Sequence, residues 1–323
     1  MYSRKMRKYE KPYLSPKEQV ELLMSRGMEI TDLAKAEECL ARIGYYRLSA
    51  YWYPFRKEQN GAVEDNFKEG TTFSLSLDYY VFDKKLRLLT LDAIERVEIA
   101  LRTDIALLLG KFDRQAHRNP EFLHGNFIRR DVLKEDKSSY QRWIEKQNRA
   151  FRLSKEEFVT HFKRKYAGQE LPIWMDVELW DFGTMSTFYA GMKVADQDYI
   201  ASLYNLNSGI TLANWLRCLN VVRNSCAHHN RLWNRPLAIL PRWKDTEKIS
   251  EIQHLRSETR YGTRYYAAAA IIKTLLNKIN PTSRWSDRLM NLMDTLPENP
   301  FIGEQNAGFP PNWREQALWK QNP

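Results

Sequence analysis

The chain has 323 residues, and its 43% hydrophobic content is enough to bury the core of one large domain or two modest ones. It has no run of 18 or more apolar residues, and its basic N-terminus lacks the apolar core of a secretory signal, so we expect a cytoplasmic protein without a membrane span. The formal net charge of +10 favours polyanions such as nucleic acid, without identifying one.

The three cysteines are too few and too scattered for a disulfide framework. No CxxC or paired His/Cys spacing indicates a zinc site. We therefore expect no metal or other cofactor, and buried thiols at Cys39, Cys218 and Cys226.

The N-terminal region predicts a helical hairpin. From Ser15 to Glu18 the chain combines an N-cap serine, a proline at the first helical position and a glutamate at the third, so a helix begins there and ends near Gly27. Thr31 opens a second helix, which Gly44 can stop by adopting a left-handed conformation.

Residues 45–56 are densely aromatic with basic residues interleaved, as on surfaces that stack bases. Core packing is the better interpretation, with Arg47 and Arg56 at its edge, although Arg47 remains a candidate RNA contact. Asn60-Gly61 marks a turn. Residues 67–73 form either a short hairpin or an irregular loop, the one β segment that the sequence predicts.

Apolar residues recur at spacings of three and four from about residue 76 to 109, which predicts a long amphipathic helix. Residues 111–150 are polar and mixed in charge, so we expect an exposed insertion there. A second capping box at Ser154 predicts a helix with cations near its C-terminal end, at Lys163, Arg164 and Lys165.

The rest of the chain also reads as helical. Pro172 precedes two helices broken at Gly183, and further helices cover about 196–204 and Thr211 to about Arg231. Two more, over 265–279 and 283–296, are separated by Pro281, and the tail from Pro297 packs as an extended arm or is mobile. We expect an all-α protein divided at about 1–73, 74–237 and 238–323.

The helix that begins at Thr211 carries two opposite faces. An apolar stripe predicts a core contact and consists of Leu212, Trp215, Leu219, Val222 and Cys226. The opposite face combines two cations, an imidazole and amides, which suits binding and cleaving a phosphodiester. It consists of Arg217, Asn220, Asn224, His228 and Arg231, so Arg217 and Arg231 are candidate RNA contacts.

Arg223 lies beside the apolar stripe, about 140° around the helix from His228, so the two are poorly placed to act on one phosphate within one chain. Two copies of the helix about a two-fold axis would bring Arg223 to His228 of the partner subunit, which predicts a homodimer with a shared site. The spacing of Arg118 and His124 also fits, but Pro120 and the polar insertion argue against a rigid pair there.

The segment Arg223-Asn224-Ser225-Cys226-Ala227-His228-His229-Asn230 resembles the R-N-x-x-A-H form of the Arg-x4-6-His motif of HEPN ribonucleases. The wider chain resembles the Abi family of abortive-infection proteins, of the AbiD and AbiF type, which carries a HEPN-like helical bundle. The blocks that carry the resemblance appear in family order over about residues 11–237: KPYLSPKEQVELL, RIGYYRLSAYWYPF, LDAIERVEIALRTDIA, LPIWMDVELWDFGTMSTFY and RNSCAHHNRLWN.

The resemblance implies metal-independent RNA cleavage, in which the ribose 2′-hydroxyl attacks the adjacent phosphate and leaves a 2′,3′-cyclic end; DNA could bind without being cut. His228 would then act as general acid or base, and Arg223 would stabilise the charge on the phosphate. Asn224 would orient His228. His229 fits the motif as well, so which imidazole carries the proton stays open.

Acidic residues supply candidate partners for this site. Glu178, a lone acid in a largely apolar helix, could pair with Arg223 or another active-site cation, although a structural salt bridge is the plainer interpretation. Glu95, Glu98 and Arg102 share a face of the long helix and predict a solvated or ion-paired surface.

The resemblance also implies a toxin that halts growth after phage attack and a small-RNA or protein antitoxin encoded nearby. One alternative is a non-catalytic HEPN-like module that binds RNA or nucleotides through the same residues. Another is a helical interaction protein in which Arg223 anchors the dimer through a carboxylate.

Overall fold

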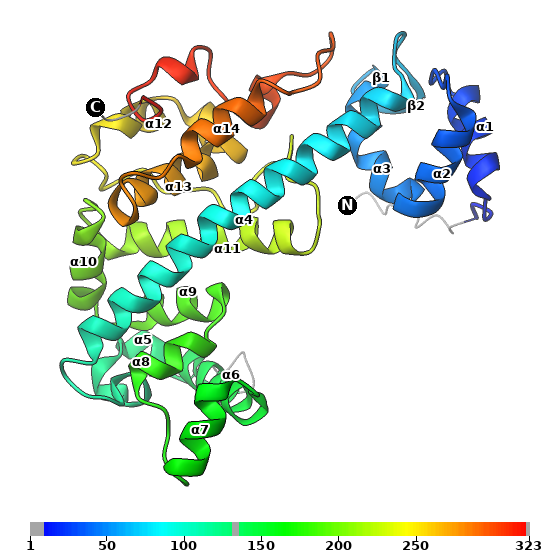
Figure 1. Cartoon of the computed structure of the whole chain (residues 1–323). Coiled ribbons are helices and arrows are strands. Elements are labelled where there is room, and N and C mark those ends of the chain that lie inside the picture. The colour runs from blue at the N-terminus through cyan, green and yellow to red at the C-terminus, as the bar shows by residue number, and fades with distance from the viewer. Residues whose placement is uncertain (1–9, 131–135, 321–323) are drawn as a thin grey trace, which may run out of the picture. The chain divides into compact units, whose positions relative to one another are not determined.

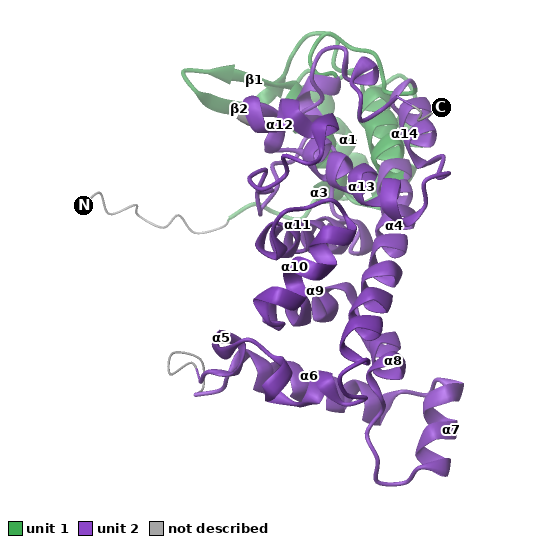
Figure 2. Cartoon of the chain, turned by 90° about the vertical axis from the view of Figure 1, so that its left-hand side faces the viewer, with its two compact units in different colours: residues 1–84, 295–303 green, residues 85–294, 304–323 purple. Residues whose placement is uncertain are grey.

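The structure is a computed structural model that describes residues 10–130 and 136–320. Within these residues it contains fourteen α-helices and one two-stranded sheet, so the predicted all-α class is confirmed (Figure 1). The chain forms two compact units (Figure 2). Unit 1 holds residues up to 84 together with 295–303, and unit 2 holds 85–294 together with 304–320.

Unit 1 begins with the predicted helical hairpin, α1 (Pro16–Ser25) and α2 (Leu33–Ile43). The capping box of α1 is confirmed, because the Glu18 carboxylate accepts a 2.7 Å hydrogen bond from the backbone N–H of Ser15. Asp32 caps α2 instead of Thr31 by accepting a 2.9 Å hydrogen bond from the N–H of Lys35.

The aromatic segment forms α3 (Tyr45–Trp52) and the short 3-10 helix η1 (Tyr53–Phe55). Its role as core is confirmed for four side chains, which are buried: Leu48, Tyr51, Trp52 and Phe55. The hydroxyl of Tyr51 donates a 2.6 Å hydrogen bond to the Asp83 carboxylate, which satisfies a buried acid in the first part of α4 (Phe73–Leu109).

The hairpin lies at Asn60-Gly61, where β1 (Arg56–Gln59) pairs antiparallel with β2 (Ala62–Phe67). Both turn residues have positive φ, 52° and 77°, as a two-residue turn of this kind requires. Of the two alternatives predicted for residues 67–73, the structure has the irregular loop and not a hairpin: β2 ends at Phe67, and α4 begins at Phe73.

Unit 2 contains the remainder of α4 and ten further α-helices among the described residues (Figures 1 and 2). They are α5 (Gly125–Ile128), α6 (Ser139–Leu153), α7 (Glu157–Lys165), α8 (Ile173–Asp176), α9 (Phe182–Gly191), α10 (Val194–Leu203), α11 (Gly209–Ala227), α12 (Gln253–Ser257), α13 (Tyr265–Ile279) and α14 (Trp285–Met293). Pro281 lies between α13 and α14, as predicted.

Helix α11 is the centre of unit 2, because α9, α10 and α13 all pack against it. The predicted apolar stripe is confirmed: each of its five members is at most 2% exposed. The three cysteines are buried free thiols, as expected, and burial raises the pKa of Cys218 to about 12.

The expectation that residues 111–150 form an exposed insertion is wrong. Trp143 of α6 is buried, packs against Trp180 and Phe188 at centroid distances of 5.2 and 4.8 Å, and donates a 3.1 Å hydrogen bond to the carbonyl of Thr184. The polar composition belongs to the outer faces of helices whose inner faces carry single large side chains.

Two predicted helix boundaries also shift. Glu156, not Ser154, is the N-cap of α7, although Lys163, Arg164 and Lys165 do lie in its last turn. The break expected at Gly183 falls at Trp180, because Asp181 caps α9 through a 2.7 Å hydrogen bond from the N–H of Thr184.

The tail packs as an arm, which is one of the two predicted alternatives. Its 295–303 segment joins unit 1, where Asn299 donates a 2.8 Å hydrogen bond to the hydroxyl of Tyr79. Beyond it, three aromatic side chains are buried in unit 2: Phe309, Trp313 and Trp319. No helix among the described residues is long and apolar enough to cross a membrane.

The contact between α10 and α11 gives a stability prediction. A Cβ at Gly209 would lie 2.4 Å from Cβ of Gln197, so Gly209→Ala forces the two helices apart and should cost about 1–3 kcal/mol. Gly125→Ala is the matched control, because its Cβ would meet nothing within 4 Å. Urea unfolding followed by circular dichroism measures both variants, and equal stability of the two would contradict this packing.

Candidate functional site

The end of α11 decides where the candidate imidazoles lie. The helix ends at Ala227, so the predicted extension to Arg231 is wrong. His229 takes a left-handed conformation with φ 59°, and its N–H and that of Asn230 donate back to the carbonyls of Cys226 and Ser225 at 3.1 and 2.8 Å. This pair of bonds is a Schellman motif, which turns the chain away from the helix axis. Arg231 therefore does not continue the face of Arg217, whereas His228, which precedes the turn, is the C-cap and its N–H still donates to the carbonyl of Asn224 at 2.9 Å.

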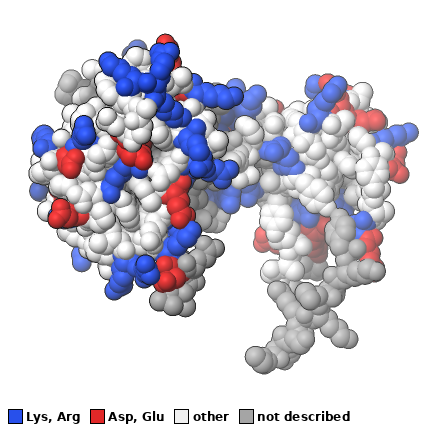
Figure 3. Space-filling model, turned by 90° about the horizontal axis from the view of Figure 1, so that it is seen from below, with Lys and Arg blue, Asp and Glu red and all other residues white. Residues whose placement is uncertain are grey.

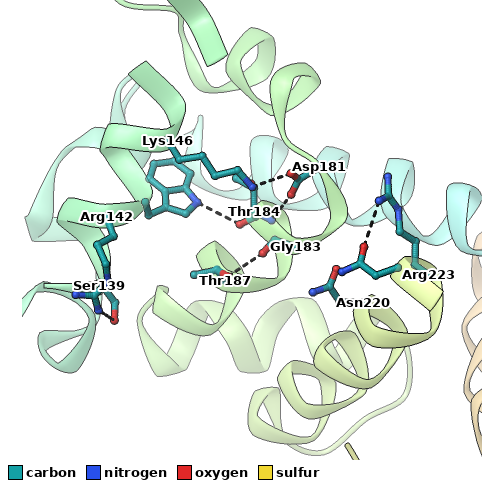
Figure 4. A pocket seen from close by; sticks show the side chains of 11 residues that line it. Ser139, Arg142, Lys146, Asp181, Gly183, Thr184, Thr187, Asn220 and Arg223 are labelled. Atoms are coloured by element: carbon teal, nitrogen blue, oxygen red, sulfur yellow. Dashed lines mark hydrogen bonds and ion pairs between the residues drawn. The ribbon is translucent and has the colours of Figure 1, made fainter. Parts of the chain in front are cut away.

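Arg223 lies between the apolar stripe and the polar face of α11. Asn220, Arg223 and Asn224 follow one another at i, i+3 and i+4, and all three line a cavity of about 480 Å³. The cavity lies between α6, α9 and α11 (Figure 4). Its other lining residues are Ser139, Arg142, Trp143, Lys146, Asp181, Gly183, Thr184 and Thr187.

Two cations of α6 and one acid of α9 form the wall opposite Arg223. Lys146 Nζ lies 2.7 Å from Asp181 Oδ2 (Figure 4). Burial opposes ionisation of Asp181, but the hydrogen bonds from Lys146 and Thr184 outweigh it and hold its pKa below the ordinary value. Arg142 donates to the carbonyl of Lys137 at 2.6 Å. The carboxylate of Asp181 is thus already paired, and the cations that line the cavity outnumber this one acid.

The Arg223 guanidinium is only lightly engaged. Within the described residues it donates one hydrogen bond, 3.3 Å to Oδ1 of the adjacent Asn224, and makes no ion pair within 4.0 Å. The acid that attracts it is Glu98 of α4, which pairs with Arg102. Burial raises the pKa of Glu98 despite the attraction of both cations.

Glu178 does not take the role proposed for it. It is exposed in η4 (Val177–Leu179), and no ion pair joins it to Arg223 in the described part of the chain. The expectation of a helical apolar setting fails because α8 tightens into this 3-10 turn before Trp180. The acid that attracts Arg223 is instead the half-buried Glu98 of α4, on the face for which the sequence predicts a solvated or ion-paired surface.

The remaining predicted site residues are dispersed. His228 and His229 are exposed, and neither lines the cavity of Arg223, so the choice between them stays open. Arg217 is exposed and lines a neighbouring cavity, whereas Arg231 lines a separate small one. Arg47 is exposed on α3 of unit 1.

Sequence reasoning missed the residues that α6 and α9 contribute. Arg142, Lys146 and Asp181 were hidden in segments read as insertion or apolar helix, and their shared position follows from the packing of Trp143.

Lys and Arg side chains are interspersed with Asp and Glu on the face shown in Figure 3. The described residues contain no group of three or more His, Cys, Asp or Glu that could hold a metal ion.

A buried polar cluster supports the wall of the cavity from behind. His117 and Asp176 are fully buried, with Nε2 of the imidazole 3.4 Å from Oδ2 of the acid. That oxygen also accepts a 2.9 Å hydrogen bond from the indole of Trp180, the residue before the cap of α9. Burial, together with repulsion from Arg118, lowers the pKa of His117 to about 3, so the imidazole is neutral near pH 7.

Residues 38–234, more than half of the chain, match the model of a protein family described as Abi-like protein. The matched range includes α4, the cavity and all three polar residues that α11 contributes to it. No curated protein and no solved structure matches the chain.

The neutral state of His117 gives a pH prediction. Because its folded pKa of about 3 lies below the ordinary 6.5, the contribution to stability is present above pH 6.5 and is lost as the pH falls towards 3. The loss should reach roughly 3–5 kcal/mol. His117→Gln should therefore show a shallower fall in unfolding free energy over this range, measured by urea unfolding at each pH.

His161→Gln serves as the control, because His161 is an exposed imidazole on α7. It should keep the wild-type pH dependence. A wild-type slope in His117→Gln would show that His117 does not cause the acid sensitivity.

Proposed function

The chain belongs to the Abi-like protein family, and from this we propose that it is an endoribonuclease of the abortive-infection type that acts through Arg223 and His228. The observation that carries the proposal is the Arg223 guanidinium, which faces a cavity without an ion-pair partner within 4.0 Å among the described residues. An arginine kept available in this way suits a phosphate, which its planar fork can bind through two parallel hydrogen bonds.

The charges around Arg223 support a phosphate as the ligand. Arg142 and Lys146 face the same cavity. The negative charge of Asp181 is balanced by the ion pair with Lys146 and by the hydrogen bond from the first turn of α9. Glu98 holds Arg102 and attracts Arg223 from the α4 side, which favours one orientation of the guanidinium. A phosphate bound here would meet an excess of positive charge.

The proposed reaction uses the ribose of the substrate. The 2′-oxygen attacks phosphorus, the bond from phosphorus to the 5′-oxygen breaks, and a 2′,3′-cyclic phosphate and a 5′-hydroxyl result. A base accepts the 2′-hydroxyl proton and an acid donates one to the leaving 5′-oxygen. His228 suits either role because an imidazole nitrogen can accept or donate a proton, and Arg223 stabilises the charge on the phosphorane oxygens.

His228 requires a second copy of the chain in this proposal. It is exposed at the C-cap of α11 and lies outside the lining of the Arg223 cavity. In a homodimer, His228 of the partner subunit would complete the cavity, as predicted from the helical spacing. Growth arrest, and restraint by a small RNA or a protein antitoxin, are parts of the same proposal.

The alternative is a non-catalytic RNA-binding module, which the absence of His228 and His229 from the cavity lining favours. Its Arg223 would hold a phosphate without cleaving the strand. Subunit mixing separates the two functions, because cleavage in a shared site depends on both chains.

Arg223→Ala and His228→Ala should each lower RNA cleavage by about 10²–10⁴-fold, since each removes one charge-stabilising or proton-transferring group. After the two variants exchange subunits, half of the dimers are mixed and each holds one intact site, so about a quarter of the wild-type rate should return. The measurement is the rate of cyclic-phosphate formation on single-stranded RNA.

Mixing His161→Ala with wild type is the control for the exchange procedure, because His161 is exposed on α7 and lines none of the described cavities. Failure of the two inactive variants to complement, with exchange verified by mass-tagged subunits, would refute the shared site. Cleavage by neither wild type nor mixture would favour the binding module.

A further inference from the structure

A second cavity of about 460 Å³ adjoins that of Arg223. The two share four lining residues, Ser139, Gly183, Thr187 and Asn220, so they form one continuous groove over α9 and α11. We call the half with Arg223 the cationic half, and the other the apolar half. Both halves belong to unit 2.

The two halves offer different chemistry. Three cations, Arg142, Lys146 and Arg223, line the cationic half. The apolar half is lined by four apolar residues, Phe127, Ala190, Val221 and Ile239, and by the polar residues His124, Asn126, Arg217 and Ser186. A nucleotide has the same division between an apolar ring face and an anionic phosphate.

Asn220 stands where the halves meet. Its side-chain amide has no hydrogen-bond partner within the described residues, so a donor and an acceptor are available to a ligand. Gly183 lies against it: a Cβ there would sit 3.3 Å from Asn220 Oδ1. The missing side chain keeps the amide open to the groove. Amides of this kind read the edges of bases through paired hydrogen bonds.

His124 adds an oriented donor to the apolar half. Its Nδ1 accepts a 3.1 Å hydrogen bond from the N–H of Asn126 at the start of α5. In the neutral ring the proton therefore lies on Nε2. Arg217, at the same half, makes no ion pair with any described residue.

We propose that this groove binds one nucleotide step of single-stranded RNA, with a base in the apolar half and the adjoining phosphate in the cationic half. The inference rests on the proposed function and specifies its substrate as an unpaired strand. A base can enter the apolar half only when it is unstacked, which loops and single strands allow and a duplex does not. The volume of each half falls in the range of small-ligand sites.

Thr187 gives a test that leaves the proposed catalytic residues intact. It is exposed, lines both halves, and its hydroxyl donates within α9 to the carbonyl of Gly183. Thr187→Glu places a carboxylate at the junction, and Thr187→Gln is the uncharged control of the same length. The probe is a fluorescent single-stranded RNA with 2′-O-methyl riboses, which can bind without being cleaved, and the readout is fluorescence anisotropy.

Thr187→Glu should weaken binding by about tenfold or more, because its charge repels the phosphate, whereas Thr187→Gln should stay within about threefold of wild type. Binding should also weaken for a duplex of the same sequence. Three results would each contradict the proposed binding groove: wild-type affinity in Thr187→Glu, an equal loss of affinity in both variants, or equal binding of duplex and single strand.

The outcome is separable from that of the catalytic proposal, because the probe cannot be cut. Charge-dependent binding at Thr187 without cleavage of unmodified RNA would support the groove and reject the nuclease. If Thr187→Glu cleaves RNA at the wild-type rate, the proposed binding groove is rejected and the proposed nuclease activity is supported.

Discussion

The burial of the apolar stripe of α11 is the constraint on which the rest of unit 2 depends. Leu212, Trp215 and Leu219 are wholly buried, and α9, α10 and α13 pack around the helix that carries them. A helix with one face fixed in a core has no rotational freedom left for its opposite face. The positions of Asn220 and Arg223 at the cavity are therefore set by side chains that never touch a ligand.

The cavity is assembled from three segments that are far apart in the sequence. Helix α6 supplies Arg142 and Lys146, and α9 supplies Asp181 at its N-cap. Trp143 joins α6 to α9 together with the ion pair between Lys146 and Asp181: its ring packs against Trp180 and Phe188, and its indole N–H donates to the carbonyl of Thr184. Two cations on the same helix are thereby held at the cavity. The face shown in Figure 3 mixes positive and negative side chains.

The polar groups near this cavity are arranged by burial as much as by charge. Glu98 is kept beside Arg102 and Arg223 in a setting that opposes its ionisation, while Asp181 is ionised through its hydrogen bonds with Lys146 and the first turn of α9. The pKa values of the two acids are thus shifted in opposite directions, one by burial and the other by hydrogen bonds. Behind them, the buried Asp176 side chain accepts a hydrogen bond from the indole of Trp180 and lies beside the neutral His117 imidazole.

The sequence by itself determined the helical class, the capping box at Ser15, the apolar stripe of α11 and the family, because periodicity, cap residues and ordered blocks are local signals. It placed Arg223, Asn220 and Asn224 on one helix but could not show that they share a cavity. Only the tertiary structure decided that α11 stops at Ala227. The left-handed residue after the helix is His229 and not a glycine, so the sequence carries no signal for the end of the helix there. It also decided that Glu98 and not Glu178 attracts Arg223, and that α6 completes the site. Those outcomes depend on which buried faces meet, and a one-dimensional pattern shows that a face is apolar without showing its partner.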